Sequence, residues 1–173
     1  QPGMTTSKEI RDKAMLELLY ATGIRVSELI GLELSDLNMQ VGYITCRDGQ
    51  KERMVPFGKP AKQALSVYLE KGRHELLKGK ESQWLFTNCS GKAMSRQGFW
   101  KIIKYYGEKA GIQADITPHT LRHSFAAHLI RGGADIHAVQ AMLGHSDSTT
   151  THMYAAYSGN TVGETYRAAL PRK

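Results

Sequence analysis

Two short β-prone runs on either side of Asp48-Gly49 constrain the fold more than any other feature of the sequence. The runs cover residues 43–46 and 54–57, and an Asp-Gly pair between such runs is a strong signal for a β-hairpin. A third run at residues 84–87 is expected to extend the same sheet. Elsewhere the apolar residues recur at helical spacing. The sequence therefore predicts a mainly α-helical fold with a small antiparallel sheet of about three strands.

Capping and stop signals predict where the helices begin and end. Thr6 and Glu9 have the spacing of a capping box, and Gly23 is expected to end the first helix. A short helical piece should follow at residues 26–31. Later helices are expected to begin at Pro60, Ser95, Thr117-Pro118 and Asp135.

The charge balance limits the classes of partner. Lys and Arg number 23 against 16 Asp and Glu in 173 residues, which gives a net charge of +7. An excess of this size on one domain suggests a polyanionic partner, most simply nucleic acid. The 2 cysteines are too few for a disulfide scaffold, and no apolar run approaches the ~20 residues that span a bilayer. We therefore expect a cytoplasmic protein with no membrane partner.

The histidines are concentrated late in the chain, where six of the seven lie between His119 and His152. His119 and His123 share a helix face at i, i+4, but no carboxylate or cysteine stands at metal-ligand spacing, so a metal site is disfavoured. His119-x-x-Arg122 at a helix start fits a phosphate site better, because a guanidinium matches two phosphate oxygens and the helix N-terminus is positive. Taken alone, His119 would more often cap the helix or pack, and Arg122 would more often form a salt bridge.

Further residues complete an ordered set. Arg25 lies within residues 21–29, which read Ala-Thr-Gly-Ile-Arg-Val-Ser-Glu-Leu, and the segments 119–125 and 143–154 follow. With these motifs the chain resembles the tyrosine recombinase (phage-integrase-type) family, in particular its Xer branch. The resemblance covers nearly the whole chain and implies the family's catalytic-domain fold over residues 1–173. Full-length members carry a core-binding domain before this one, and we expect it to be absent from this chain, which begins at Gln1.

The resemblance implies chemistry at a DNA phosphodiester. Tyr154 would attack the phosphate, form a 3′-phosphotyrosine and release a 5′ hydroxyl; a phenol with a pKa near ~10 needs assistance at neutral pH. Arg25 and Arg122 would clamp the non-bridging oxygens. His119 would assist proton transfer from the tyrosine, and His145 would donate a hydrogen bond to the phosphate. No metal or other cofactor is expected.

The hairpin departs from the Xer pattern. That pattern is G-K-G-x-K-E-R, whose first lysine is the general acid toward the departing 5′ oxygen, whereas residues 47–53 here read Arg-Asp-Gly-Gln-Lys-Glu-Arg. Asp48 therefore stands at the lysine position, where a carboxylate beside a phosphate is electrostatically wrong. Either Lys51 takes the role, or Arg47 substitutes, or cleavage is impaired. We expect Lys51, against the alternative that it is a solvated strand-end lysine.

The resemblance favours a site-specific DNA recombinase, and leaves open chromosome dimer resolution or mobile-element integration and excision. Two alternatives remain: a topoisomerase IB-like nicking-closing enzyme, and a DNA-binding module without catalysis, to which Asp48 lends weight. The expected partners are a double-stranded recombination site and a homo- or hetero-tetramer of protomers on two DNA sites. In that tetramer a C-terminal helix would dock in trans through an apolar stripe of Val162, Tyr166, Ala169 and Leu170.

Overall fold

The fold is mainly helical with one small sheet. The computed structural model describes residues 6–109 and the single positions 111, 117, 120, 123, 126, 127, 130, 131, 133, 135 and 137. The named elements, in chain order, are α1 (Ser7–Thr22), α2 (Val26–Ile30), η1 (Leu34–Asp36), β1 (Leu37–Asn38), β2 (Tyr43–Asp48), β3 (Lys51–Pro56), α3 (Lys59–Val67), η2 (Tyr68–Gly72), α4 (Arg73–Leu77) and α5 (Arg96–Lys109). The predicted fold class is confirmed.

The helix ends follow the capping signals in the sequence. The Thr6 hydroxyl accepts a hydrogen bond of 3.2 Å from the Glu9 N–H, and the Glu9 carboxylate accepts one of 2.9 Å from the Thr6 N–H, so the predicted capping box is formed. Gly23 closes α1 at a φ of 64°, a conformation that glycine adopts without steric cost. At α5 the Ser95 hydroxyl accepts from the Gly98 N–H at 2.9 Å.

The antiparallel sheet has the order β1-β2-β3. Gly49 and Gln50 connect β2 to β3, and Gly49 has a φ of 63°, so the predicted hairpin is confirmed. The prediction that residues 84–87 form the third strand is wrong, because that segment makes only isolated bridges outside the sheet. The third strand is β1, which a tight turn at residues 39–42 folds straight back onto the edge of β2.

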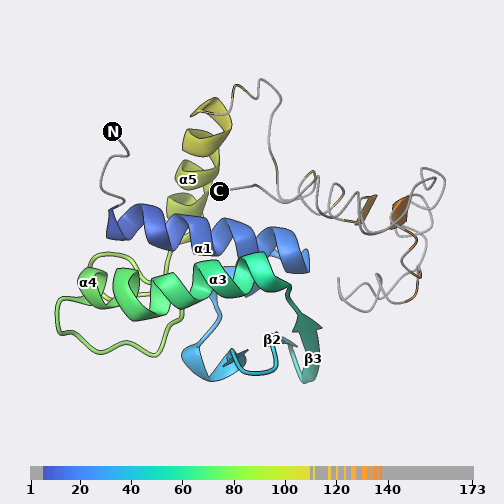
Figure 1. Cartoon of the computed structure of the whole chain (residues 1–173), viewed down its shortest axis with the longest axis horizontal. Helices are drawn as coiled ribbons and strands as arrows, with labels where there is room; N and C mark the ends of the chain where they lie inside the picture. Colours follow the sequence, from blue (N-terminus) through green and yellow to red (C-terminus); the bar gives the residue numbers. More distant parts are fainter. Residues whose placement is uncertain are drawn as a thin grey trace.

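The helices α3, η2 and α4 follow one another as a single rod that lies along α1 (Figure 1). The middle piece, η2, is a π-helical turn. Its Tyr68 is fully buried and donates a hydrogen bond of 2.8 Å to the Leu85 carbonyl. Gly72 lies so close to α1 that a Cβ there would stand 2.7 Å from Ile10 Cγ2. The rod and α1 therefore pack with almost no gap at this point.

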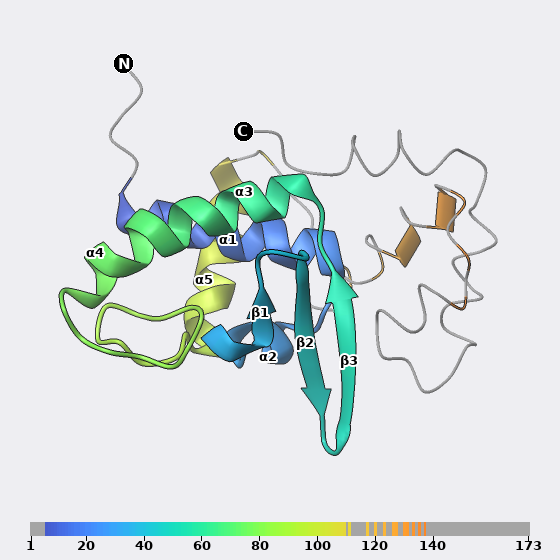
Figure 2. The same ribbon diagram turned by 60° about the horizontal axis from the view of Figure 1, so that its bottom comes forward.

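A single apolar core holds these elements together, and the hairpin extends from it (Figure 2). Met15 and Leu18 of α1 are fully buried, as is Phe99 of α5; burying one such side chain stabilises the fold by about 1.5–3 kcal/mol. Ile44 and Val55 face each other at the base of the hairpin and are also fully buried. The base of the hairpin is thus fixed in the core, while residues 47–52 at its tip are exposed.

Candidate active site

Arg25 lies at the junction between α1 and α2, where the chain changes direction. Its backbone is extended, with φ −69° and ψ 150°, and it precedes the first residue of α2. Its N–H donates a hydrogen bond of 2.8 Å to Oε2 of Glu28, one turn into that helix. This bond fixes the main chain of Arg25, while the guanidinium extends toward solvent with its side chain 37% exposed. The junction therefore presents a cation from a rigid backbone.

Glu28 also ties α2 to the hairpin. Its Oε1 and Oε2 accept hydrogen bonds of 2.8 Å and 2.9 Å from Nη1 and Nη2 of Arg53, a two-pronged pair. Such bidentate contacts fix orientation as well as distance. Glu28 is 8% exposed and Arg53 is 16% exposed, so the pair is largely shielded from water. One carboxylate thus holds both the main chain of Arg25 and the second strand of the hairpin.

Cys46 is buried beside this pair, opposite Arg53 in the sheet. Burial raises the pKa of the Cys46 thiol to about 12, and the neighbouring Glu28 carboxylate raises it further. The thiol is therefore neutral at physiological pH, which makes it a packing group here.

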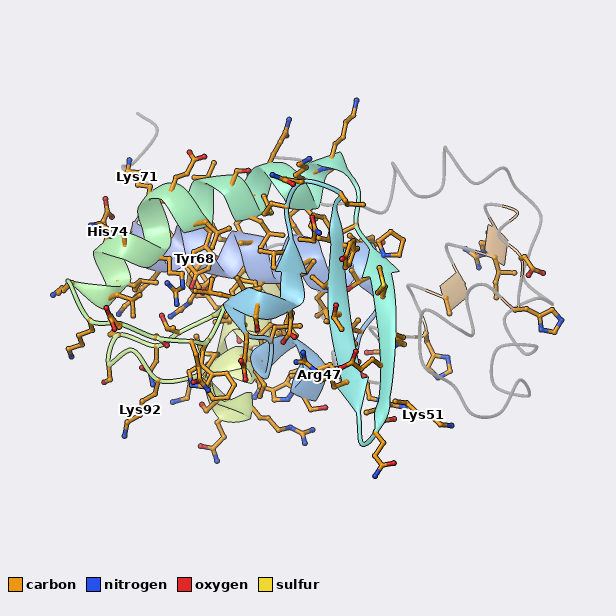
Figure 3. All side chains as sticks on the ribbon, turned by 90° about the horizontal axis from the view of Figure 1, so that it is seen from below. Arg47, Lys51, Tyr68, Lys71, His74 and Lys92 are labelled. Atoms are coloured by element: carbon orange, nitrogen blue, oxygen red, sulfur yellow. The ribbon has the colours of Figure 1, made fainter. Side chains whose placement is uncertain are left out.

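Arg47 lies on the other face of the hairpin. Strand residues alternate between faces, and Arg47 pairs in register with Glu52, whereas Asp48 pairs with Lys51. The Arg47 guanidinium donates to the buried carboxylate of Asp36 and, at 3.1 Å from Nε, to Glu52. Figure 3 labels Arg47 on the first strand of the hairpin and Lys51 at the start of the second. Two carboxylates thus engage Arg47, which argues against it as the substitute for the family's lysine.

Asp48 and Lys51 face each other across the tip of the hairpin. The Asp48 carboxylate lies on the side of Arg25, with its Oδ2 at 3.4 Å from Nη1 of the guanidinium. Because directly paired residues point to the same face of a sheet, Lys51 shares that face. Lys51 therefore stands on the same side of the hairpin as Arg25, which is the face required of a residue that acts on an anion held there.

These groups line an open hollow between α2, η1 and the hairpin. Its volume is about 500 Å³. Two arginines and four carboxylates line it, so an anion that binds an arginine here competes with these carboxylates. The charged residues of its lining are Arg25, Glu28, Glu33, Asp36, Arg47 and Asp48.

Of the predicted set, the structure describes Arg25 and Lys51 and places Lys51 opposite Asp48, the residue whose carboxylate contacts Arg25. His119, Arg122, His145 and Tyr154 lie outside the described residues, as does the tail from Val162 to Leu170. Sequence reasoning missed Glu28 and Arg53. The spacing of Arg25 and Glu28 is that of a capping box, but an arginine at the first position hides the pattern.

Two features are absent from the part of the chain that the structure describes. Within residues 6–109 and the described single positions, no three His, Cys, Asp or Glu side chains gather as a metal site would require. None of the helices described there is long and apolar enough to cross a membrane.

Comparison with known proteins identifies the chain's relatives. Tyrosine recombinase XerD of Staphylococcus epidermidis is 50% identical over 172 residues, which cover 99% of this chain and 58% of that protein. The XerD of Halalkalibacterium halodurans is 49% identical over 164 residues, 94% of this chain and 55% of that protein. The chain therefore spans a little over half the length of these relatives.

Solved structures agree with the sequence relatives. The crystal structure of XerA recombinase matches with a TM-score of 0.76 at 33% identity, covering 96% of this chain and 61% of that one. The XerH site-specific recombinase, bound to its difH substrate in a pre-cleavage complex, matches with a TM-score of 0.75 at 27% identity, covering 87% and 44%. The phage integrase family itself matches over residues 3–160. A match of this extent, on a fold shared with Xer recombinases, makes the chain a member of the phage integrase family.

Proposed function

We propose that this chain is the catalytic domain of a site-specific DNA recombinase that cleaves and rejoins DNA through a 3′-phosphotyrosine on Tyr154. The observation that carries the proposal is the 50% identity to a tyrosine recombinase over 99% of the chain, in a sequence that keeps the ordered set Arg25, His119, Arg122, His145 and Tyr154. The relatives are longer, so a core-binding domain elsewhere in the protein is part of the proposal.

In this mechanism the cationic side chains supply the stabilisation that other phosphoryl-transfer enzymes obtain from a metal. Arg25 and Arg122 bind the non-bridging oxygens as charge accumulates on the phosphate. Arg25 is well suited, because its main chain is fixed by Glu28 while its side chain remains 37% exposed. His119 takes part in moving the tyrosine proton and His145 donates to the phosphate.

Lys51 is the proposed general acid toward the departing 5′ oxygen. It shares a hairpin face with Asp48, whose carboxylate contacts Arg25. Its long side chain can therefore reach a phosphate that is bound at Arg25. A 5′-phosphorothiolate bond tests this role, because sulfur leaves without needing a proton. Lys51→Ala should be slow on ordinary DNA and recover on the sulfur substrate. Equal slowness on both would remove Lys51 from the role.

Covalent trapping tests the reaction itself. The full chain is incubated with a pool of nicked duplexes that carry a randomised site, and adducts that survive denaturation are collected and sequenced. Wild-type protein should yield a 3′-phosphotyrosyl adduct, and Tyr154→Phe should yield none while binding DNA as well as before. An adduct in Tyr154→Phe would assign the nucleophile elsewhere. Binding without any adduct in the wild type would favour a DNA-binding module.

Covalent trapping does not separate a recombinase from the topoisomerase IB-like alternative, because both form the same tyrosyl linkage. Strand exchange between two DNA sites separates them. The proposed assembly is a tetramer on two DNA sites in which the tail helix docks in trans. Deleting residues from Gly159 onward should then leave folding and single-site binding intact and reduce pairing of two sites. A truncated chain that unfolds would show that the tail docks on its own protomer.

A further inference from the structure

Asp48 places a negative charge directly against the arginine that the proposed mechanism assigns to phosphate binding. We propose that the Asp48 carboxylate occupies the anion-binding side of Arg25 when no DNA is present, and that a DNA phosphate must displace it. The inference rests on the proposed function for the identity of the incoming anion. Asp48 is in this view a positioning residue, which acts on the substrate through Arg25.

The contacts around Arg25 single out Asp48 as the occupant. Glu28 is the other carboxylate near the guanidinium, but its Oε1 stands 3.8 Å from Nη1. Both of its oxygens are already bonded, to Arg53 and to the Arg25 N–H. Asp48 Oδ2 is closer, at 3.4 Å, and meets the geometry of a hydrogen bond. Within the described residues, Asp48 is therefore the carboxylate that accepts a hydrogen bond from the guanidinium.

Arg47, the other arginine of the hollow, has carboxylate partners of its own. Asp36 and Glu52 both accept hydrogen bonds from Arg47. One of these partners of Arg47, Asp36, is buried, whereas Arg25 donates its hydrogen bond to the exposed Asp48.

The ion pair between Asp48 and Arg25 is weak enough for a phosphate to replace the carboxylate. Asp48 is 65% exposed and Arg25 is 37% exposed, and an ion pair at this exposure is weak because water competes with both charges. A phosphodiester carries a single negative charge, as a carboxylate does, so the exchange replaces like with like. Lys51 stands directly opposite Asp48 on the same face and can accept the displaced carboxylate as a cross-strand partner.

The direct test measures phosphate at Arg25 without any DNA chemistry. Inorganic phosphate is titrated into the full chain while the guanidinium resonances of Arg25, assigned by their loss in Arg25→Lys, are followed by NMR. Asp48→Asn should lower the apparent dissociation constant for phosphate by about two- to fivefold, the size expected for removing an exposed ion pair. Asp48→Glu, which restores the charge, should return the constant toward the wild-type value.

Glu52→Gln is the matched control. Glu52 stands on the same hairpin, is 62% exposed, and loses the same charge on substitution, but its partner is Arg47. It should leave the phosphate affinity of Arg25 within about 1.5-fold of wild type, since only the general field of the protein changes. Equal tightening in both variants would reduce the effect to net charge and overturn the proposal.

Two other outcomes also decide the matter. Unchanged affinity in Asp48→Asn, or no response of Arg25 to phosphate in any variant, would show that Asp48 does not compete for this site. Thermal unfolding of each variant confirms that the exposed substitutions leave the fold intact. Because the titration involves no cleavage, a negative titration leaves the trapping experiment on Tyr154 unaffected. A negative trapping experiment likewise leaves the phosphate titration unaffected.

Discussion

Glu28→Gln tests whether one carboxylate fixes the junction that carries Arg25. The substitution keeps the shape of the side chain and removes its charge. Three hydrogen bonds end on the Glu28 carboxylate, from the Arg25 N–H and from two nitrogens of Arg53. A glutamine amide has one acceptor oxygen, so at least one donor of Arg53 would face an NH₂ group instead.

The magnitude follows from burial. Removing one partner of a buried ion pair costs about 3–5 kcal/mol, and Arg53, at 16% exposure, recovers part of that cost from water. Loss of the helix cap would add up to about 1 kcal/mol. We expect the free energy of unfolding to fall by about 2–4 kcal/mol, which for a chain of this length lowers Tm by roughly 4–16 °C.

Urea unfolding monitored by circular dichroism measures this directly, with the m-value checked for constancy. Glu52→Gln is the control, because its pair with Arg47 is exposed on both sides and should contribute less than about 1 kcal/mol. The double variant Glu28→Gln/Arg53→Met should be more stable than the sum of its single variants predicts, since neither charge is then left unpaired. A loss below about 0.5 kcal/mol in Glu28→Gln would refute the reasoning.

Three further substitutions and treatments test the packing of the fold. Iodoacetamide at about pH 8 should alkylate the exposed Cys89 and spare Cys46, whose buried thiol has its pKa raised to about 12; two adducts on native protein, by mass spectrometry, would contradict this. Burial raises the pKa of Glu17 above its ordinary value of 4.5, so the folded chain binds that proton more tightly and stability should fall as pH rises above about 4.5. Urea titrations from about pH 4 to 7 should show that Glu17→Gln flattens this fall, and parallel curves would count against it. Gly72→Ala should lower the unfolding free energy by about 1–3 kcal/mol, because its Cβ would stand 2.7 Å from Ile10 Cγ2; an unchanged urea midpoint would show that α1 yields at this contact.

The local signals of the sequence were sufficient for most of the fold. The Thr6 capping box and Gly23 set the ends of α1, because these residues act within one turn of the helix. The hairpin followed from Gly49 and the flanking β-prone runs. The third strand was assigned to the wrong segment, since β1 is only two residues long and is defined by its pairing partner. Pairing of this kind depends on the tertiary structure, which local propensity does not contain.

The candidate site was predictable as a set of residues and not as a network. Arg25 and Lys51 were found because they belong to motifs of a family. Glu28 and Arg53 were not predicted as a pair, because they lie 25 residues apart in the sequence. They come together only when α2 packs against the hairpin. The contact of Asp48 with Arg25 was likewise hidden, although the departure of Asp48 from the Xer pattern had marked the position.

The π-helical turn of the long rod has a consequence for how this protein tolerates changes in length. Tyr68, Gly72 and Leu76 are buried along the rod, and the π-helical turn from Tyr68 to Gly72 takes more residues than the 3.6 of an α-helical turn. The widened turn absorbs one additional residue while α4 keeps its buried side toward α1. A variant with one residue fewer in this stretch would need only to close the turn into regular α-helix. The π-helical turn therefore separates the register of α4 from that of α3, so a change of one residue in this stretch need not disturb the rest of the fold.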